Sequence, residues 1–256
     1  GQDLRIPFIH HIGMRVDGGD VPGDEVPVLL REVQVLRRVR RCWRGPRFRL
    51  DAEMLRDGVL VMGGLLVDKV GGKSVRPYQP AGLWKAVGYS GSNTVRFVQD
   101  HGVGLFRRSL YTFWKRTAAP PTMLTFDAPS RESCTVRRAR TNTPLQALLL
   151  LNDVQFVEAA RGLAQQLLAG PGTDRQRLVR GFRIVTARKP RADELVVLQQ
   201  TLQFHLGEYR EHPESARKLL AVGESKRDMK LDVADHAAWT LLANLLLNLD
   251  ETVTKN

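Results

Sequence analysis

The chain has 256 residues, 43% of them hydrophobic, which is enough to bury one large core or two small ones. Its net charge of +12 would suit nucleic acid. However, the basic residues are spread along the chain and form no block interleaved with aromatic residues, so we expect no nucleic-acid partner. No apolar run reaches the roughly 18 residues that a membrane span requires.

Cysteine and histidine usage argues against a metal or haem site. The two cysteines, Cys42 and Cys134, give no disulfide framework and no CxxC pair. We expect free thiols, with one disulfide between them as the alternative. The six histidines show no spacing typical of metal ligands. The sequence therefore predicts no metal and no cofactor in this chain.

Residues 1–44 differ in composition from the rest of the chain. They are rich in Arg, Val, Gly and Pro and show no sustained periodicity. Only Val28–Val39 could form a modest amphipathic helix. We expect this segment to be poorly ordered or loosely attached, because its pattern supports no packed element.

The first clear helical pattern covers Leu50–Leu66, with Asp51 as its expected N-cap. Residues 69–103 are rich in Gly, Pro, Ser and Asn, with a few aromatic residues, and predict a long irregular segment. Within it, Val70–Ser74 resembles the end of a phosphate-binding loop. The motif has Val67 in place of its first glycine and follows a helix pattern rather than a strand, so we do not expect a nucleotide site here.

Leu105–Lys115 is expected to form a short helix whose aromatic residues face the core, and Pro120 and Pro121 are expected to stop it. A second irregular segment covers residues 117–142.

The C-terminal half has strong helical signals. Thr143–Gln146 is a capping box with proline at the first helical position, and its helix is expected to break or re-cap at Asn152 and Asp153 before ending near Leu168. A second capping box, Thr173–Gln176, opens a helix to about residue 187. Further helices are predicted over Ala192–Arg210, Glu214–Val222 and Val233–Leu249. The expected fold class is mainly α, a multi-helix bundle with irregular segments at about 69–103 and 117–142 and a poorly structured N-terminus.

The last predicted helix is apolar around almost its whole circumference. From residue 237 to 249 only Thr240, Asn244 and Asn248 are polar, and they stand four residues apart on one stripe. A helix of this kind is surrounded by protein. The stripe is then a thin solvent window or a buried amide ladder that bonds to neighbouring loops, and we favour the ladder. Trp239 and Leu242 are predicted to be buried.

A dense polar cluster precedes the first capping box; its members are Asp127, Arg131, Glu132, Arg137, Arg138, Arg140 and Asn142. The two acids could be the carboxylate pair of a carbohydrate-active site. The arginines, with Asn142, could clamp a carboxylate or sulfate. The interpretation that we favour is an ordered loop whose charges neutralise one another. At least two of its arginines would then pair with carboxylates or helix-terminal carbonyls, and the candidate partners are Asp127, Glu132, Asp153, Asp250 and Glu251.

Five stretches carry a resemblance to a known family: GPRFRLDAEMLRD (45–57), SVRPYQPAGLW (74–84), LFRRSLYTFWKRT (105–117), TFDAPSRESCTVRRARTNTPLQALLLLND (125–153) and AAWTLLANLLLNLDETVTK (237–255). They resemble the planctomycete C-terminal domain of unknown function, which is the last module of large exported proteins that begin with a cytochrome-c-like domain. The resemblance implies an exported, periplasmic or envelope location, and haem only in a module absent from this chain. It carries over no catalytic residue. The best-matching positions mark where to look: Asp127, Arg131, Arg137, Arg138, Arg140, Asn142, Asn152 and Asp153.

The resemblance covers residues 45–256, whereas residues 1–44 depart from it and could derive from an out-of-frame reading. The function we expect is a scaffold or interaction module whose partners are other domains of the parent protein. The alternatives are a hydrolase that uses Asp127 or Glu132, and a binder of sulfated or acidic polysaccharide that uses the cluster arginines.

Overall fold

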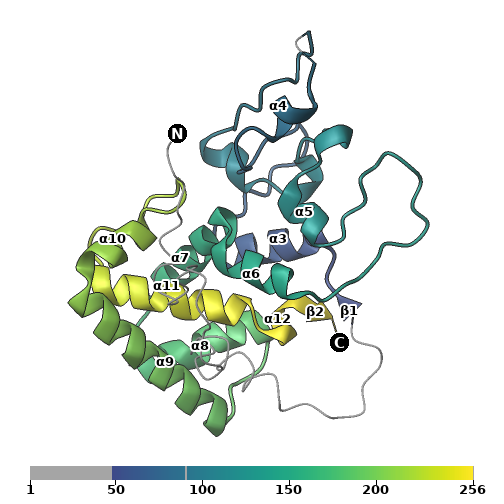
Figure 1. Cartoon of the computed structure of the whole chain (residues 1–256). Helices are drawn as coiled ribbons and strands as arrows, with labels where there is room; N and C mark the ends of the chain where they lie inside the picture. Colours follow the sequence, from purple (N-terminus) through teal and green to yellow (C-terminus); the bar gives the residue numbers. More distant parts are fainter. Residues whose placement is uncertain (1–47, 90, 256) are drawn as a thin grey trace, which may run out of the picture.

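The computed structural model describes residues 48–89 and 91–255, and it confirms a mainly α fold (Figure 1). The predictions for residues 1–44, including the Val28–Val39 helix, lie outside the described residues. The longer helices are α3 (Ala52–Met62), α6 (Pro144–Asn152), α7 (Val154–Ala169), α8 (Asp174–Thr186), α9 (Ala192–Glu211), α10 (Pro213–Leu220) and α11 (Val233–Leu247). Short elements are α4 (Leu83–Val87), α5 (Pro121–Thr125), α12 (Asp250–Val253) and the 3₁₀ turns η1 (Gly102–Phe106), η2 (Ser109–Tyr111) and η3 (Arg116–Ala118).

Helix α11 is the centre of the helical layer. It packs against α7, α9 and α10, and Figure 1 shows it crossing the middle of this layer. Every residue from His236 to Leu247 is buried, as the apolar circumference predicts. Trp239 is 2% exposed and Leu242 is 0% exposed, so both burial predictions are confirmed.

The polar stripe of α11 is the predicted amide ladder. Asn244 donates its Nδ2 to the carbonyl of Leu151 at 3.4 Å, and Asn248 donates its Nδ2 to the carbonyl of Ala147 at 3.2 Å. Both carbonyls belong to α6 rather than to a loop, and that of Leu151 lies in the last turn, where a carbonyl has no partner within its own helix. The two amides therefore attach α6 to the central helix.

Both predicted capping boxes are present. The hydroxyl of Thr143 accepts from the backbone N–H of Gln146, and the Gln146 side chain accepts from the backbone N–H of Thr143. The same exchange joins Thr173 and Gln176 at the start of α8. The predicted break is also confirmed, because Asp153 ends α6 and caps α7.

Helix α3 is joined to the helical layer by a close backbone contact and a small sheet. A Cβ atom on Gly63 would lie 2.6 Å from the carbonyl oxygen of Ala159 in α7, so only glycine fits where α3 ends. Just before α3, β1 (Phe48–Arg49) pairs antiparallel with β2 (Thr254–Lys255). The sheet brings the two ends of the described chain together.

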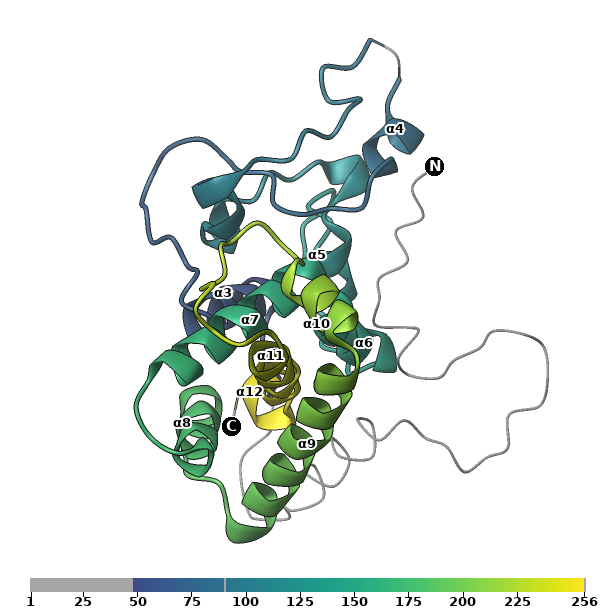
Figure 2. The same cartoon turned by 90° about the vertical axis from the view of Figure 1, so that its left-hand side faces the viewer.

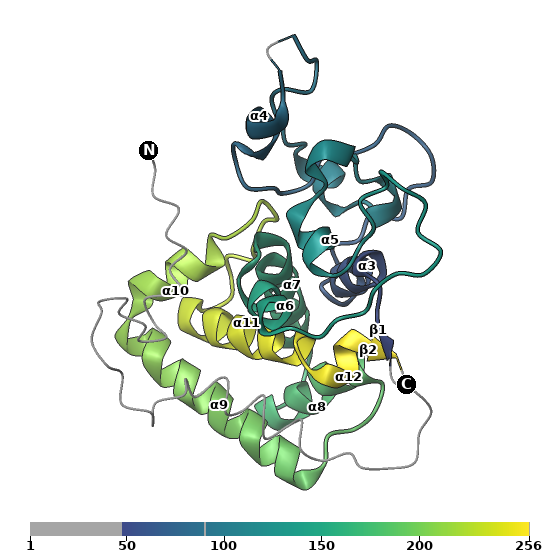
Figure 3. The same ribbon diagram turned by 45° about the vertical axis from the view of Figure 1, so that its right-hand side comes forward.

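Residues 63–89 and 91–142 lie over one side of the helical layer, as Figures 1 and 3 show. The prediction of a helix over Leu105–Lys115 is wrong, because the segment forms the turns η1 and η2. Between them Arg107 donates to the carbonyls of Lys69, Gly71 and Lys73 at 2.5–2.9 Å. These long-range bonds outweigh the local helical preference.

Pro120 and Pro121 also differ from expectation, because they begin a helix. Pro121 is the first residue of α5, where its missing N–H costs nothing. The sequence argument that proline stops a helix is correct for the preceding residues, but it overlooked that proline favours the first turn of the next helix.

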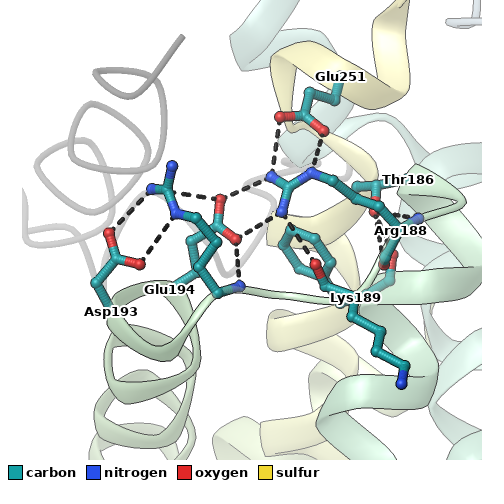
Figure 4. Close-up of polar contacts among 8 residues, drawn as sticks. Thr186, Arg188, Lys189, Asp193, Glu194 and Glu251 are labelled. Carbon is teal, nitrogen blue, oxygen red and sulfur yellow. Dashed lines mark hydrogen bonds and ion pairs between the residues drawn. The ribbon is translucent and has the colours of Figure 1, made fainter.

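An ion-pair network connects α9 and α12 at the turn between α8 and α9. Arg188, between α8 and α9, donates to both carboxylate oxygens of Glu194 and of Glu251 at 2.7–2.9 Å (Figure 4). Glu194 lies in the first turn of α9, and Glu251 lies in α12. One guanidinium group thus holds the C-terminal segment against the α8–α9 turn.

Candidate functional site

Asp127 opens the polar cluster and fixes the base of a long loop, residues 127–142. Its carboxylate accepts from the backbone N–H of Thr141 at 2.7 Å and from the Thr141 hydroxyl at 2.8 and 3.1 Å. Its backbone φ of 60° is in the left-handed region, which is uncommon for a residue other than glycine. The Asp127 side chain therefore joins the two ends of the 127–142 loop.

Arg131 and Glu132 follow on the same arm of the loop. The guanidinium carbon of Arg131 lies 4.3 Å from the ring centroid of Trp114, a cation–π contact, and the Trp114 indole donates to the carbonyl of Ser130 at 2.8 Å. Arg131 also has a left-handed φ, 65°. Glu132 is exposed, and its backbone N–H donates to the Ser130 hydroxyl. The two candidate acids are thus in different environments, one hydrogen-bonded at the loop base and one at the surface.

Arg138 and Arg140 fix the other arm to the start of α3. Arg138 donates to both oxygens of Glu53 at 2.7 and 3.1 Å and lies 3.9 Å from Asp51. Arg140 lies 3.8 Å from Asp51 and stacks on the ring of Phe48. Two cluster arginines therefore form ion pairs, but with carboxylates other than the five we named as candidates.

The pKa of Glu53 reflects this contact. Burial alone would raise the pKa, but the hydrogen bond and the charge of Arg138 outweigh it, so the pKa of Glu53 lies below its ordinary value. The Glu53 hydrogen bond in turn raises the pKa of Arg138. Asp51 occupies the expected N-cap position but caps no amide with its side chain; it faces the arginines instead.

We define the loop tip as residues 132–137. Each of its side chains is exposed, Val136 completely, and Arg137 makes no hydrogen bond or ion pair with any described residue. Cys134 is a free, exposed thiol, whereas Cys42 lies outside the described residues. The tip thus stands clear of the body of the protein while both arms are attached to it.

The other positions that the family resemblance singled out make contacts that stabilise the fold. Asn142 accepts from Arg49 at 2.9 Å, and Asn152 donates to the carbonyl of Leu148. Asp153 accepts from the Thr122 hydroxyl at 2.8 Å and from the backbone N–H of Gln155. Burial raises the pKa of Asp153.

We expect Arg138→Ala to lower the free energy of unfolding by about 1–2 kcal/mol at pH 7, because the pair with Glu53 is bidentate but only partly buried. This is less than a fully buried pair would contribute. Since the pKa of folded Glu53 is lowered, the pair stabilises the fold above the unfolded pKa of Glu53, and its contribution is lost as pH falls through the folded value. Urea denaturation at pH 7 and pH 3 measures both effects.

The neighbouring substitution Arg137→Ala is the matched control and is expected to change stability by less than about 0.5 kcal/mol. Equal effects of the two substitutions, or an unchanged melting temperature for Arg138→Ala, would contradict a structural role for Arg138.

A second polar group, missed by the sequence analysis, is buried beneath the loops. Arg56 of α3 is 3% exposed and donates to Gln155 and to the carbonyls of Leu105 and Arg107 at 2.6–2.8 Å. Burial lowers the pKa of Arg56 to about 10. Arg56 and Gln155 line a largely enclosed cavity of about 20 Å³ between α3, α5 and α7. A space of this size holds a single water molecule and excludes a sugar ring.

A third polar group connects α7 with Tyr78 and with the segment that follows α10. Glu158 of α7 is fully buried and accepts from the hydroxyl of Tyr78 at 3.0 Å, and it also lies 3.5 Å from Arg161. Arg161 donates to the carbonyls of Leu220, Val222 and Ser225. Burial raises the pKa of Tyr78. This network fastens the segment after α10 to α7, so its contacts are those of a structural element.

The described residues contain no helix long and apolar enough to cross a membrane. Nor do they contain a group of three or more His, Cys, Asp or Glu side chains that could hold a metal ion.

Comparison with known proteins gives a family but no activity. No curated protein matches the chain, and no solved structure does. A family match begins at residue 32, inside the segment that we expected to depart from the family, and ends at residue 202 within α9. It covers about two thirds of the chain and includes the whole 127–142 loop. By this match the chain belongs to the family described as PSD1, protein of unknown function (DUF1553).

Proposed function

We propose that this chain is a scaffold or interaction module of a larger exported protein of the periplasm or cell envelope that also carries a cytochrome-c-like domain. Its partners would be other domains of that protein, and any haem would belong to the cytochrome-c-like domain. The resemblance of the quoted motifs supports this context. The family membership fits a module whose activity is unknown.

The observation that carries the proposal is the construction of the 127–142 loop. Two residues other than glycine adopt left-handed conformations in its first arm, Asp127 at the base and Arg131 next to the tip, each at a cost of about 1–2 kcal/mol. Such strain persists where surrounding contacts hold it, and Asp127–Thr141, Arg131–Trp114 and Arg138–Glu53 supply those contacts. The loop tip is thereby held in position before any partner arrives, which reduces the entropy lost on binding.

The tip itself has the composition of a contact surface. Val136 exposes an aliphatic side chain completely, and the next residue, Arg137, is exposed and has no charged partner among the described residues. A partner domain that offers an apolar recess and a carboxylate would match both. Arginine is also one of the residues enriched among interface hot spots.

The alternative functions have less support. A hydrolase that uses Asp127 would have to break its hydrogen bonds to Thr141, and the cavity beside Arg56 and Gln155 is too small for a sugar and is lined by no residue of the cluster. A binder of acidic polysaccharide would have to compete with Asp51 and Glu53 for Arg138 and Arg140. Arg131 and Arg137 remain the members of the cluster best placed for such a role.

Isothermal titration of the chain with the separately purified cytochrome-c-like domain of its parent protein tests the proposal. The double substitution Val136→Asp with Arg137→Glu is expected to weaken binding at least about tenfold without changing the melting temperature. Val103→Asp with Arg96→Glu is the matched control, because Val103 is 70% exposed and Arg96 is exposed away from the tip.

Binding that is equally affected by both double variants, or by neither, would refute the role of the loop tip. Dextran sulfate, a sulfated polysaccharide, tests the alternative function of polysaccharide binding. A rise in the melting temperature of the wild type that disappears in Arg137→Ala would favour polysaccharide binding over the proposed module.

A further inference from the structure

Helix α8 has an outer stripe that makes little contact with the described protein. Its inner face, with Leu178, Phe182 and Val185, packs on the helical layer, and Figure 2 shows α8 at the margin of that layer. The outer stripe consists of positions three or four residues apart, which share one side of a helix. It lines an open depression of about 440 Å³ and comprises Gln176, Val179, Arg180, Arg183, Ile184 and Ala187.

The charges on this stripe are not neutralised within the described residues. The Arg183 side chain is exposed and makes no hydrogen bond or ion pair with them. Arg180 makes one hydrogen bond, to the carbonyl of Pro171 at 2.9 Å. The stripe contains no acid. By contrast, Arg177 pairs with Asp174, and Arg188 is saturated by two glutamates (Figure 4).

Aliphatic side chains line the same depression as the two arginines. Ile184 is 41% exposed, and Val179 is partly exposed one turn before Arg183. A sulfated polysaccharide would use the guanidinium groups and gain little from these side chains. An amphipathic peptide with carboxylates and aliphatic residues would use both, because arginine binds carboxylate through paired hydrogen bonds and the aliphatic groups bury apolar area.

We propose that the outer stripe of α8 binds an acidic amphipathic segment of a partner protein. The stripe spans residues 176–187 and so measures roughly 16 Å, which matches three turns of a partner helix. A helix with carboxylates three or four residues apart would place two of them opposite Arg180 and Arg183. This site involves none of the residues of the 127–142 loop, so it stands independently of the proposed function.

Fluorescence anisotropy with the full chain and a labelled twelve-residue peptide tests the proposal. The peptide carries Glu and Leu at helical spacing, and a scrambled peptide of the same composition serves as its control. Arg180→Glu with Arg183→Glu is expected to weaken binding of the patterned peptide at least about tenfold. Arg96→Glu with Arg116→Glu makes the same charge change at exposed positions elsewhere and is expected to weaken it less than about threefold, through the overall charge alone.

Ile184→Gln is the decisive variant, because it leaves the charge unchanged. It is expected to weaken binding of the patterned peptide about threefold or more, and to leave binding of heparin unchanged. Circular dichroism checks that each variant is folded, and Arg183→Gln repeats the charge test at an exposed position without charge reversal.

Three outcomes would overturn the proposal. The scrambled peptide could bind as tightly as the patterned one, the two double variants could behave alike, or Ile184→Gln could have no effect. Tighter binding of heparin, insensitive to Ile184→Gln, would assign the stripe to sulfated polysaccharide instead. Binding only to vesicles of anionic lipid would assign it to a membrane surface.

Discussion

Replacing Trp239 by alanine is expected to lower the free energy of unfolding by about 3–5 kcal/mol. Trp239 is 2% exposed in the middle of α11, the helix against which α7, α9 and α10 pack. Removing the indole leaves a cavity that these helices cannot close without moving relative to one another. The loss therefore combines the transfer free energy of the ring with that of the cavity.

Urea denaturation followed by circular dichroism measures this loss. Tyr89→Ala is the matched control, since Tyr89 is also a large aromatic residue but is 76% exposed; its substitution is expected to change stability by less than about 0.5 kcal/mol. A loss below about 1 kcal/mol for Trp239→Ala would show that α11 is not the centre of the core.

The features of the fold that the sequence predicted are local ones. The Thr143 and Thr173 capping boxes depend on residues three positions apart, and the amide ladder on residues four apart. Such spacings are visible in the sequence because the helix itself brings these residues together. The Leu105–Lys115 prediction failed for the opposite reason, since Arg107 is bonded to carbonyls more than thirty residues earlier.

The candidate site likewise combines features that a local sequence pattern reveals with long-range contacts that it does not. Density of charge between apolar helices singled out Arg138 and Arg140, but not their partners. Glu53 lies 85 residues before Arg138 in the chain, and nothing in its local sequence marks it as a partner of the cluster. Glu251, named as a possible partner of the cluster, pairs with Arg188 instead. Charge pairing over such separations depends on packing that no local pattern encodes.

Arg56 illustrates a residue that sequence reasoning could hardly have found. In an amphipathic helix an arginine is expected at the solvent face. Here the loops that follow α3 cover it and supply carbonyls for its guanidinium, so that it is buried with its donors satisfied. Only the course of residues 63–112 over α3 reveals this.

Replacing Arg188 by methionine is expected to lower the free energy of unfolding by about 3 kcal/mol at pH 7. Methionine keeps much of the aliphatic length but removes the positive charge between two carboxylates. Glu194 is only 4% exposed, so its charge would remain buried beside that of Glu251 with its main counter-ion gone. Urea is the suitable denaturant, because it does not screen charges.

The loss should depend on pH in a defined direction. Burial by itself would raise the pKa of Glu194, but hydrogen bonds from Arg188 and from the backbone N–H of Arg191 outweigh it, so in the folded wild type this pKa is lowered. Glu194 therefore stabilises the wild type above its unfolded pKa, about 4.3, and this contribution is lost as pH falls through the folded value. Without Arg188, burial dominates and the folded pKa of Glu194 rises above the unfolded one. Protonation of Glu194 then removes its buried charge and with it part of the destabilisation of the variant. The difference in unfolding free energy between wild type and variant therefore becomes smaller from pH 7 towards pH 4.

Lys189→Met provides the control for this experiment. Figure 4 shows the Lys189 side chain directed away from the carboxylates, so the same change of charge one residue later should leave stability within about 0.5 kcal/mol at every pH. If Arg188→Met instead lost stability equally at pH 7 and pH 4, the loss would come from packing, for instance from the contact of Arg188 with the Phe182 ring, and the two glutamates would contribute little. A loss that narrows with falling pH identifies this arginine as the charge that holds α12 to the α8–α9 turn.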